Sequence, residues 1–157
     1  MSKTAIGSGF EITLRILLML DEVSPASLDE SQIEAIDFMS VYAADFELMD
    51  ENLPGDSLYR FGEFPARKSL VEPALNGLVL DSYADFSTAA SGYRYSITDS
   101  GRQLSRKMTS TYADEYRIAV HAVAEKYGIT DSGQMIRDIN KLTIKSLEEA
   151  GHGQILS

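Results

Sequence analysis

The chain has 157 residues, 44% of them hydrophobic and 24% charged, which favours one globular domain over residues 1–157, with loose ends near 1–9 and 151–157. Cysteine is absent, which excludes disulfides and thiolate metal sites. No apolar run approaches the roughly 20 residues that span a bilayer, and Glu11 and Arg15 interrupt any signal-like start. We therefore expect a cytoplasmic protein without a membrane partner.

The net charge of −10 is unevenly distributed along the chain. Residues 1–66 carry 13 acidic and 3 basic side chains, whereas residues 67–107 carry 4 acidic and 6 basic ones. Phosphate backbones repel an acidic protein on average, so the totals argue against non-specific binding of nucleic acid. The locally basic segment leaves a local contact with DNA open.

An apolar helix is predicted over Phe10–Val23, and Ser24-Pro25 ends it. One of its faces is formed by Phe10, Leu14, Leu17 and Leu18. Because the helix is apolar nearly all round, it is interpreted as a core helix; the alternative is that one face docks on another protein.

A second helix is predicted from about Asp29 to Leu48, with Ser27–Glu30 or Ser31–Glu34 as its capping box. Its buried stripe is formed by Ile33, Ile36, Met39, Ala43 and Phe46. Its other face carries the carboxylates of Glu30, Glu34, Asp37, Asp45 and Glu47. This acidic face is interpreted as solvated, and the sharper alternative is docking of a basic partner.

The stretch from Leu53 to Leu80 is expected to organise the chain. Residues 50–66 are non-periodic but too rich in large apolar groups for a floppy loop. An apolar ladder follows, formed by Leu70, Val71, Ala74, Leu75 and Leu78. It predicts a helix from about Ala66 to Asn76, ended by Asn76 and Gly77. Pro73 falls inside this helix, so we expect a kink, or two short turns meeting near Leu70.

A β-hairpin is predicted next, with strands Leu78–Ala84 and Tyr93–Ile97 and a loose tip over Asp85–Gly92. A helix followed by a hairpin is the core of a winged helix. The predicted fold class is therefore mainly α with a small β-hairpin, a winged-helix-like core with additional N- and C-terminal helices.

Three more helices are predicted after the hairpin. Thr98 caps a helix that runs from Asp99 to about Met108, and a second helix, Thr111–Tyr127, ends at Gly128. Asp131 caps the last helix and Gly151 ends it. The buried positions expected along that helix are Met135, Ile136, Ile139, Leu142 and Leu147.

Groups suited to catalysis or metal binding are scarce. His121 and His152 stand far apart, and a metal site needs more ligands at set spacing. Gly7-Ser8-Gly9 lacks both the lysine of a phosphate loop and the frame of a nucleophile elbow. We predict no enzymatic activity, no catalytic residue, no metal and no cofactor; a hydrolase would rest on no visible motif.

Basic side chains near the hairpin are the candidates for contacts with DNA phosphates: Arg94, Arg102, Arg106 and Lys107. In a DNA-binding winged helix the helix enters the major groove and the wing touches phosphates. A stand-alone winged-helix transcriptional regulator is therefore the alternative function, although Pro73 and the apolar density of the helix fit it poorly.

Tyrosines cluster around the predicted wing: Tyr59, Tyr83, Tyr93 and Tyr95. Tyrosine is favoured at protein interfaces, so this cluster is consistent with a docking surface. Aromatic packing under a small sheet is the alternative.

The order of several short motifs resembles a known family. A Phe-x-x-x-x-Arg-x-Leu-Leu-x-Leu run is here Phe10, Arg15, Leu17, Leu18 and Leu20, and a Tyr-x-x-Asp-Phe helix end is Tyr42, Asp45 and Phe46. Leu53-Pro54, an Arg-x-Gly-Glu run (Arg60, Gly62, Glu63), the basic pair Arg67-Lys68 and Gly77-Leu78-Val79 follow. Over about residues 10–145 the chain resembles the middle component of bacterial three-component ABC-ATPase (ABC-3C) systems, a group overlapping the Lamassu-type anti-phage systems.

The resemblance implies a non-catalytic accessory subunit. Such a subunit would bind an SMC- or Rad50-like ATPase and an effector, often a nuclease, and would restrain the effector until foreign DNA is sensed, with DNA contacted only within the complex. The resemblance also implies a partner-interface or fold-defining motif made of Tyr42, Asp45, Arg60, Gly62, Glu63, Arg67 and Lys68. The fold-defining role is favoured because Arg-x-Gly-Glu leads directly into the helix.

Overall fold

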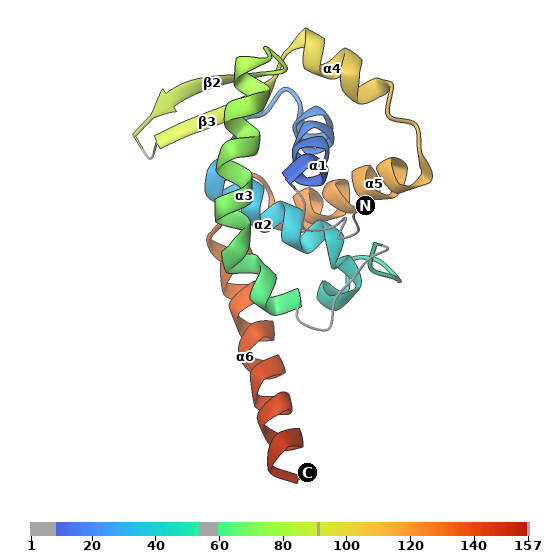
Figure 1. The fold of residues 1–157 in the computed structure, drawn as a ribbon, viewed down its shortest axis with the longest axis vertical. Coiled ribbons are helices and arrows are strands. Elements are labelled where there is room, and N and C mark those ends of the chain that lie inside the picture. The colour runs from blue at the N-terminus through green and yellow to red at the C-terminus, as the bar shows by residue number, and fades with distance from the viewer. Residues whose placement is uncertain (1–8, 54–59, 91, 157) are drawn as a thin grey trace.

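The computed structural model describes the backbone of residues 9–53, 60–90 and 92–156, and their side chains except those of 60, 61 and 150–156. These residues form six α-helices, one 3₁₀ helix and three strands (Figure 1). In chain order they are α1 (Gly9–Val23), β1 (Leu28–Asp29), α2 (Glu30–Val41), the 3₁₀ helix (Ala43–Phe46), α3 (Arg60–Leu80), β2 (Ala84–Ala89), β3 (Gly92–Ile97), α4 (Asp99–Arg106), α5 (Thr111–Tyr127) and α6 (Gly133–Leu156). The predicted class, mainly helical with a small antiparallel sheet, is confirmed.

Helix α1 lies between the other elements and packs on α3, α5, α4 and β3. Its buried side chains include Ile12, Ile16 and Leu20, which confirms that it is a core helix. Phe10 was expected on the buried face, but 73% of it is exposed. Phe10 is the second residue of α1 and so lies at the end of the helix.

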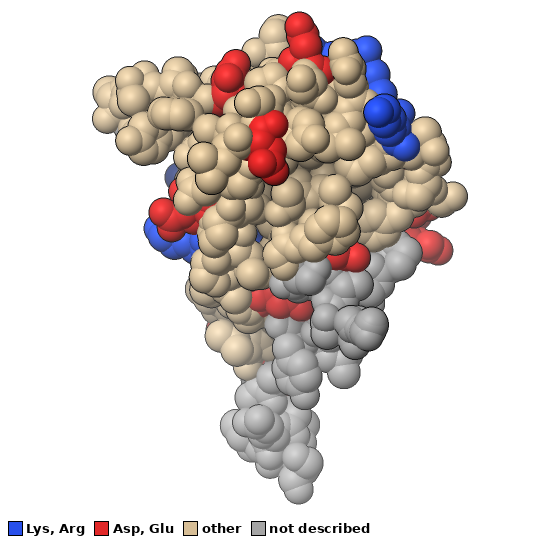
Figure 2. Space-filling model, turned by 45° about the horizontal axis from the view of Figure 1, so that its top comes forward, with Lys and Arg blue, Asp and Glu red and all other residues tan. Residues whose placement is uncertain are grey.

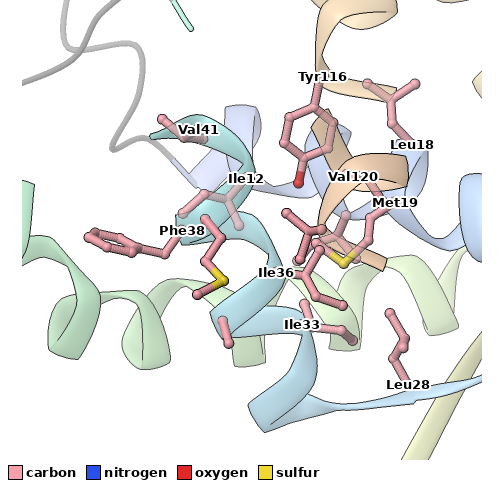
Figure 3. Packing of buried hydrophobic residues seen from close by; sticks show 14 of the residues in the cluster. Ile12, Leu18, Met19, Leu28, Ile33, Ile36, Phe38, Val41, Tyr116 and Val120 are labelled. Atoms are coloured by element: carbon pink, nitrogen blue, oxygen red, sulfur yellow. The ribbon is translucent and has the colours of Figure 1, made fainter. Parts of the chain in front are cut away.

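The hydrophobic core is built from side chains of α1, α2, α3, α5 and α6. Figure 3 shows the part where α1, α2 and α5 meet. Ile36 of α2 lies among Met19 of α1 and Val120 of α5, and the Tyr116 hydroxyl points from α5 toward α2. All five residues of the stripe predicted for the second helix are buried: Ile33, Ile36, Met39, Ala43 and Phe46.

Helix α3 is longer than predicted and runs without a break from Arg60 to Leu80, through Pro65 and Pro73. Neither Asn76 nor Gly77 ends it, and the predicted split near Leu70 is wrong. Proline in a helix interior costs about 3 kcal/mol, whereas burying a leucine side chain contributes about 1.5–3 kcal/mol. Leu75 and Leu78, both buried, therefore offset the proline.

The predicted first strand, Leu78–Ala84, is wrong because α3 continues to Leu80 and the strand begins only at Ala84, after a turn. Strand β2 begins at Ala84 and pairs antiparallel with β3 up to Ala89 opposite Gly92. The predicted loose tip, Asp85–Gly92, is thus largely part of this ladder. A third strand, β1, pairs with β3 through Leu28 and Asp29, so the sheet order is β1-β3-β2. The winged-helix-like character of this core stays a prediction.

Helix ends follow side-chain capping, although not always by the predicted residue. Asp29 caps α2: its carboxylate accepts from the Gln32 amide, and the Gln32 side chain accepts from the Asp29 amide. The capping boxes predicted at Ser27 and Ser31 are therefore wrong. Thr98 caps α4, and Gly128 ends α5, as predicted. Asp131 accepts from the Gly133 amide at the start of α6.

Helix α6 packs on α2 and α3 through its first half and then projects from the body of the molecule (Figure 1). Met135 and Ile139 are buried, but Leu147, which was expected to be buried, is exposed. The helix passes Gly151, its predicted end, and continues to Leu156. Within the described parts of the chain, no helix combines the length and the apolar character that crossing a bilayer requires.

Candidate functional site

A carboxylate buried at the junction of four helices is the most unusual chemical feature of the fold. Asp37 of α2 is fully buried, so its placement on a solvated acidic face was wrong. Arg15 of α1 donates from Nε to Oδ1 of Asp37 at 2.8 Å and from Nη2 to Oδ2 at 3.1 Å. Arg67 of α3 donates from Nε to Oδ2 at 2.9 Å, and the Tyr116 hydroxyl of α5 donates to Oδ1 at 2.7 Å.

The electrostatics of this cluster hold Asp37, Arg15 and Tyr116 in their usual protonation states. Burial alone would raise the pKa of Asp37, but the charges of Arg15 and Arg67, together with the hydrogen bonds from Arg15 and Tyr116, lower it well below its ordinary value. Burial opposes the charge of Arg15, yet the attraction of Asp37 raises the Arg15 pKa. Burial and the neighbouring Asp37 charge raise the pKa of the Tyr116 hydroxyl, which stays protonated and donates.

Two partly exposed carboxylates lie on the outer sides of the two arginines. Glu11 lies 3.7 Å from Nη1 of Arg15, and Glu63 lies 3.7 Å from Nη1 of Arg67. Removing a charge from water is costly unless it is paired and hydrogen-bonded. The two buried guanidinium groups are therefore matched by Asp37 at their centre and by one carboxylate on each outer side.

Tyr42 extends the network to the end of α2. It is fully buried, and its hydroxyl donates to Oε1 of Glu63 at 2.7 Å. Its ring contacts that of Phe38 edge-on at 5.2 Å, and the Arg67 guanidinium lies 5.1 Å from the centre of the same Phe38 ring. These contacts tie the beginning of α3 to the end of α2.

The motif residues identified in the sequence divide into two groups. Tyr42, Glu63 and Arg67 join the network around Asp37, whereas Gly62 and Lys68 are exposed. Asp45 lies half-buried within the 3₁₀ helix and accepts from the Asn52 side chain at 3.4 Å. Arg60 begins α3, and its side chain lies outside the described residues.

The four candidate contacts with DNA phosphates also fall into two groups, two that bond within the fold and two that are exposed. Arg94 donates to the backbone oxygen of Ser27 at 2.7 Å and to its hydroxyl at 2.9 Å, which ties β3 to the segment before α2. Arg102 donates to the Ser24 hydroxyl at 2.8 Å and lies 3.8 Å from Asp21 at the end of α1. Arg106 and Lys107 are exposed.

The network joins four helices at one buried side chain. The Asp37 carboxylate accepts four hydrogen bonds from the residues around it and is out of contact with solvent. Of the two histidines in the chain, His121 is largely exposed beside Glu22. The side chain of His152 lies outside the described residues. In the described ranges, no three His, Cys, Asp or Glu side chains are grouped to hold a metal ion.

Sequence reasoning missed Asp37 and Tyr116 as members of this network. A helical spacing of four residues places Asp37 on the same face as Ile33, which is buried. A charged residue in the apolar helix α1, Arg15, also requires a buried partner of opposite sign. These two signals together would have paired Arg15 with Asp37.

The structure is a small, mainly helical protein in which Tyr42, Glu63 and Arg67 of the motif link α3 to α2. The family model of the ABC-three component (ABC-3C) system Middle Component 2 matches residues 5–149, and the chain belongs to this family. The resemblance drawn from the short motifs is thereby confirmed. Nothing matches the chain among curated proteins or among solved structures.

Proposed function

We propose that this protein is a non-catalytic accessory subunit that joins an SMC- or Rad50-like ATPase to an effector such as a nuclease. In this role it restrains the effector until foreign DNA is sensed, as part of Lamassu-type defence against phage. The observation that carries the proposal is the family match over residues 5–149, since a middle component of a three-component system works with protein partners.

The use of the charged motif residues supports an accessory role. Arg15, Arg67 and Glu63 hold α1 and α3 on α2 through Asp37 and Tyr42. Side chains engaged in this way fix the shape of the domain. A fixed shape suits a subunit that other proteins grip, because less conformational freedom is lost when they bind.

Contact with DNA is assigned to the assembled complex. Arg94 and Arg102 donate to acceptors within the fold, so Arg106 and Lys107 are the exposed members of the predicted phosphate-binding set. On the face shown in Figure 2, lysine and arginine side chains form small groups at the edges, without a continuous basic stripe. A net charge of −10 further opposes binding by the isolated chain.

The test is co-expression of the tagged chain with the ATPase and the effector encoded beside it. We expect affinity purification followed by size-exclusion chromatography to give a complex that contains all three proteins. Duplex DNA at about 50 mM salt should bind this complex and not the chain alone. Elution of the chain without either partner would overturn the proposal, and steep salt-dependent binding of DNA by the chain alone would favour the stand-alone regulator.

A further inference from the structure

An apolar hollow lies open at the junction of α3 with the hairpin. Three large side chains line it while remaining mostly in solvent: Leu80 is 83% exposed, Phe86 53% and Tyr93 55%. Asn76, Val79 and Tyr95 complete the lining of a hollow of about 400 Å³. The rings of Phe86 and Tyr93 meet edge-on at 5.3 Å and so support one another across the two strands.

The sheet register shows that this hollow continues the core outward. On one face of the hairpin, Ala84 pairs with Ile97, Phe86 with Tyr95 and Thr88 with Tyr93. Ala84 is buried and Ile97 is half-buried against the core, whereas Phe86 and Tyr93 extend beyond it. In Figure 2 the outer part of the hairpin projects as an arm, and its visible face shows no charged side chain, although Asp85 and Arg94 belong to the two strands. Contiguous exposed apolar surface of this kind marks an interaction site more often than it serves stability.

A second hollow adjoins the first and shares Tyr93 and Tyr95 with it. Its volume is about 470 Å³. It lies between the start of α2, α3 and β3, and its charged lining consists of Asp29, Glu30, Glu34, Glu72 and Lys68. Four carboxylates face one ammonium group, so the hollow carries an excess of negative charge.

Part of this negative charge is poorly compensated in the free chain. Burial, a hydrogen bond to Glu30 and the repulsion of the Glu30 charge raise the pKa of Glu34 to about 7, against the opposing effect of Lys68. A cationic side chain placed between these carboxylates would relieve the repulsion and form charge-assisted hydrogen bonds. The same charges repel a phosphate backbone, which excludes nucleic acid as the occupant.

We infer that the two hollows form one docking groove for a segment of a partner protein in which a large apolar side chain neighbours an arginine or lysine side chain. The apolar group packs between Leu80 and the Phe86–Tyr93 pair, and the cation lies against Glu30, Glu34 and Glu72. This inference rests on the proposed function, because the partner is another component of the same system. Apolar anchors supply most of the affinity at such sites, while charge complementarity supplies specificity and a faster association rate.

The test compares groove variants with matched controls in the binding of the purified chain to the ATPase or the effector. The apolar pair is a double variant that combines Phe86→Ala and Tyr93→Ala. The acidic pair is a double variant that combines Glu34→Gln and Glu72→Gln. The controls are Ile118→Ala, an exposed apolar residue on α5, and Asp114→Asn, an exposed carboxylate on the same helix. We expect each groove pair to raise Kd about tenfold or more and the controls to leave it unchanged. The acidic pair should also flatten the salt dependence of binding.

A photo-crosslinking residue in place of Leu80 gives a second readout that tolerates changes in stability, because Leu80 is almost fully exposed. It should crosslink to the partner, whereas the same residue in place of Ile118 should not. The inference would be overturned if both double variants bound the partner with the affinity of the wild-type chain and position 80 gave no crosslink. The proposed function would remain intact in that case. Failure of the wild-type chain to bind either component would instead overturn both. If the wild-type chain dimerised alone and the Phe86→Ala, Tyr93→Ala double variant were monomeric, the groove would belong to an interface with a second copy of the chain.

Discussion

Arg15 and Asp37 form a two-point ion pair across the interface of α1 and α2, with both carboxylate oxygens engaged at 2.8 and 3.1 Å. Arg67 of α3 and Tyr116 of α5 contact the same carboxylate, so four helices meet at one side chain. Buried ion pairs contribute little net stability compared with apolar packing, but breaking one leaves an uncompensated charge. We therefore expect the pair to specify how the helices are placed more than it adds to the net stability of the fold.

Asp37→Asn should destabilise the fold strongly. The substitution keeps the size of the side chain but leaves two buried guanidinium groups without their central countercharge, and we expect a loss of about 3–5 kcal/mol in the free energy of unfolding. Urea denaturation followed by circular dichroism measures it. Asp85→Asn, the same change at an exposed strand position, should alter stability by less than about 0.5 kcal/mol. Equal effects of the two substitutions would show that Asp37 holds no buried charge.

Tyr116→Phe isolates one hydrogen bond of the network. It removes the hydroxyl that donates to Oδ1 of Asp37 and leaves the ring in place, so no large cavity forms. A hydrogen bond to a charged group contributes about 1.5–3 kcal/mol, and that loss is expected in the same denaturation assay. Tyr127→Phe is the matched control, because its hydroxyl donates to Asp138, a half-buried carboxylate near the surface, and should cost less than about 1 kcal/mol. A larger effect at Tyr127 would contradict the central role of Asp37.

The dependence of stability on pH should have two opposing parts. The Asp37 pKa is lower in the folded chain than its ordinary 3.8, so its contribution is present above that value and is lost as pH falls below it. The Glu34 pKa is raised from 4.5 to about 7, so its contribution is present below pH 4.5 and is lost as pH rises through about 7.

Glu34→Gln tests the second part. Because the variant lacks the carboxyl group that loses its proton, its free energy of unfolding relative to wild type should increase as pH rises from 4.5 to 8. Denaturation at several pH values measures the difference. Glu115→Gln, an exposed position on α5, should give a curve parallel to that of wild type. A parallel curve for Glu34→Gln as well would show that the Glu34 carboxyl group does not respond to its surroundings.

Arg94→Ala should act on the fold instead of on DNA binding. Arg94 donates twice to Ser27 and joins β3 to the segment before α2, so we expect a loss of about 1–2 kcal/mol in the free energy of unfolding. Arg106→Ala, at an exposed position, should leave stability within about 0.5 kcal/mol of wild type. Thermal and urea unfolding distinguish the two. If Arg94→Ala were as stable as wild type, Arg94 would again be a candidate for contact with DNA phosphates.

Local sequence patterns predicted the helices better than the sheet. Thr98 and Gly128 mark helix ends because a cap is satisfied within a few residues, so sequence alone reveals it. The bounds of strand β2 were not predicted because all but its first residue is exposed, and an exposed strand shows no alternation of buried and exposed side chains. Strand β1 was not predicted because it pairs with Tyr95 and Arg94, which lie more than sixty residues away in the sequence.

The network was only half visible in the sequence for a related reason. Arg67, Glu63 and Tyr42 were recognised as a motif, but their shared partner depends on which faces of α2 and α3 meet. Asp37 looked like one more carboxylate of an acidic helix, since charge alone does not distinguish a solvated group from a paired one. The spacing from Ile33 and the charge of Arg15 point to a buried Asp37, but only the packing of α3 and α5 on α2 shows that Arg67 and Tyr116 share it.

Gly77→Ala tests where α3 ends, the point at which sequence and structure differ most. If Gly77 ended the helix in a left-handed conformation, a Cβ atom would strain the backbone. In the structure Gly77 is inside the helix, and a Cβ atom there meets nothing within 4 Å. We therefore expect Gly77→Ala to stabilise the fold by about 0.5–1 kcal/mol, because alanine loses less backbone freedom on folding. Gly128→Ala is the matched control: Gly128 has φ of 72° at the end of α5, so alanine should cost about 1–3 kcal/mol. Destabilisation by both substitutions in urea unfolding would place the end of α3 at Gly77 after all.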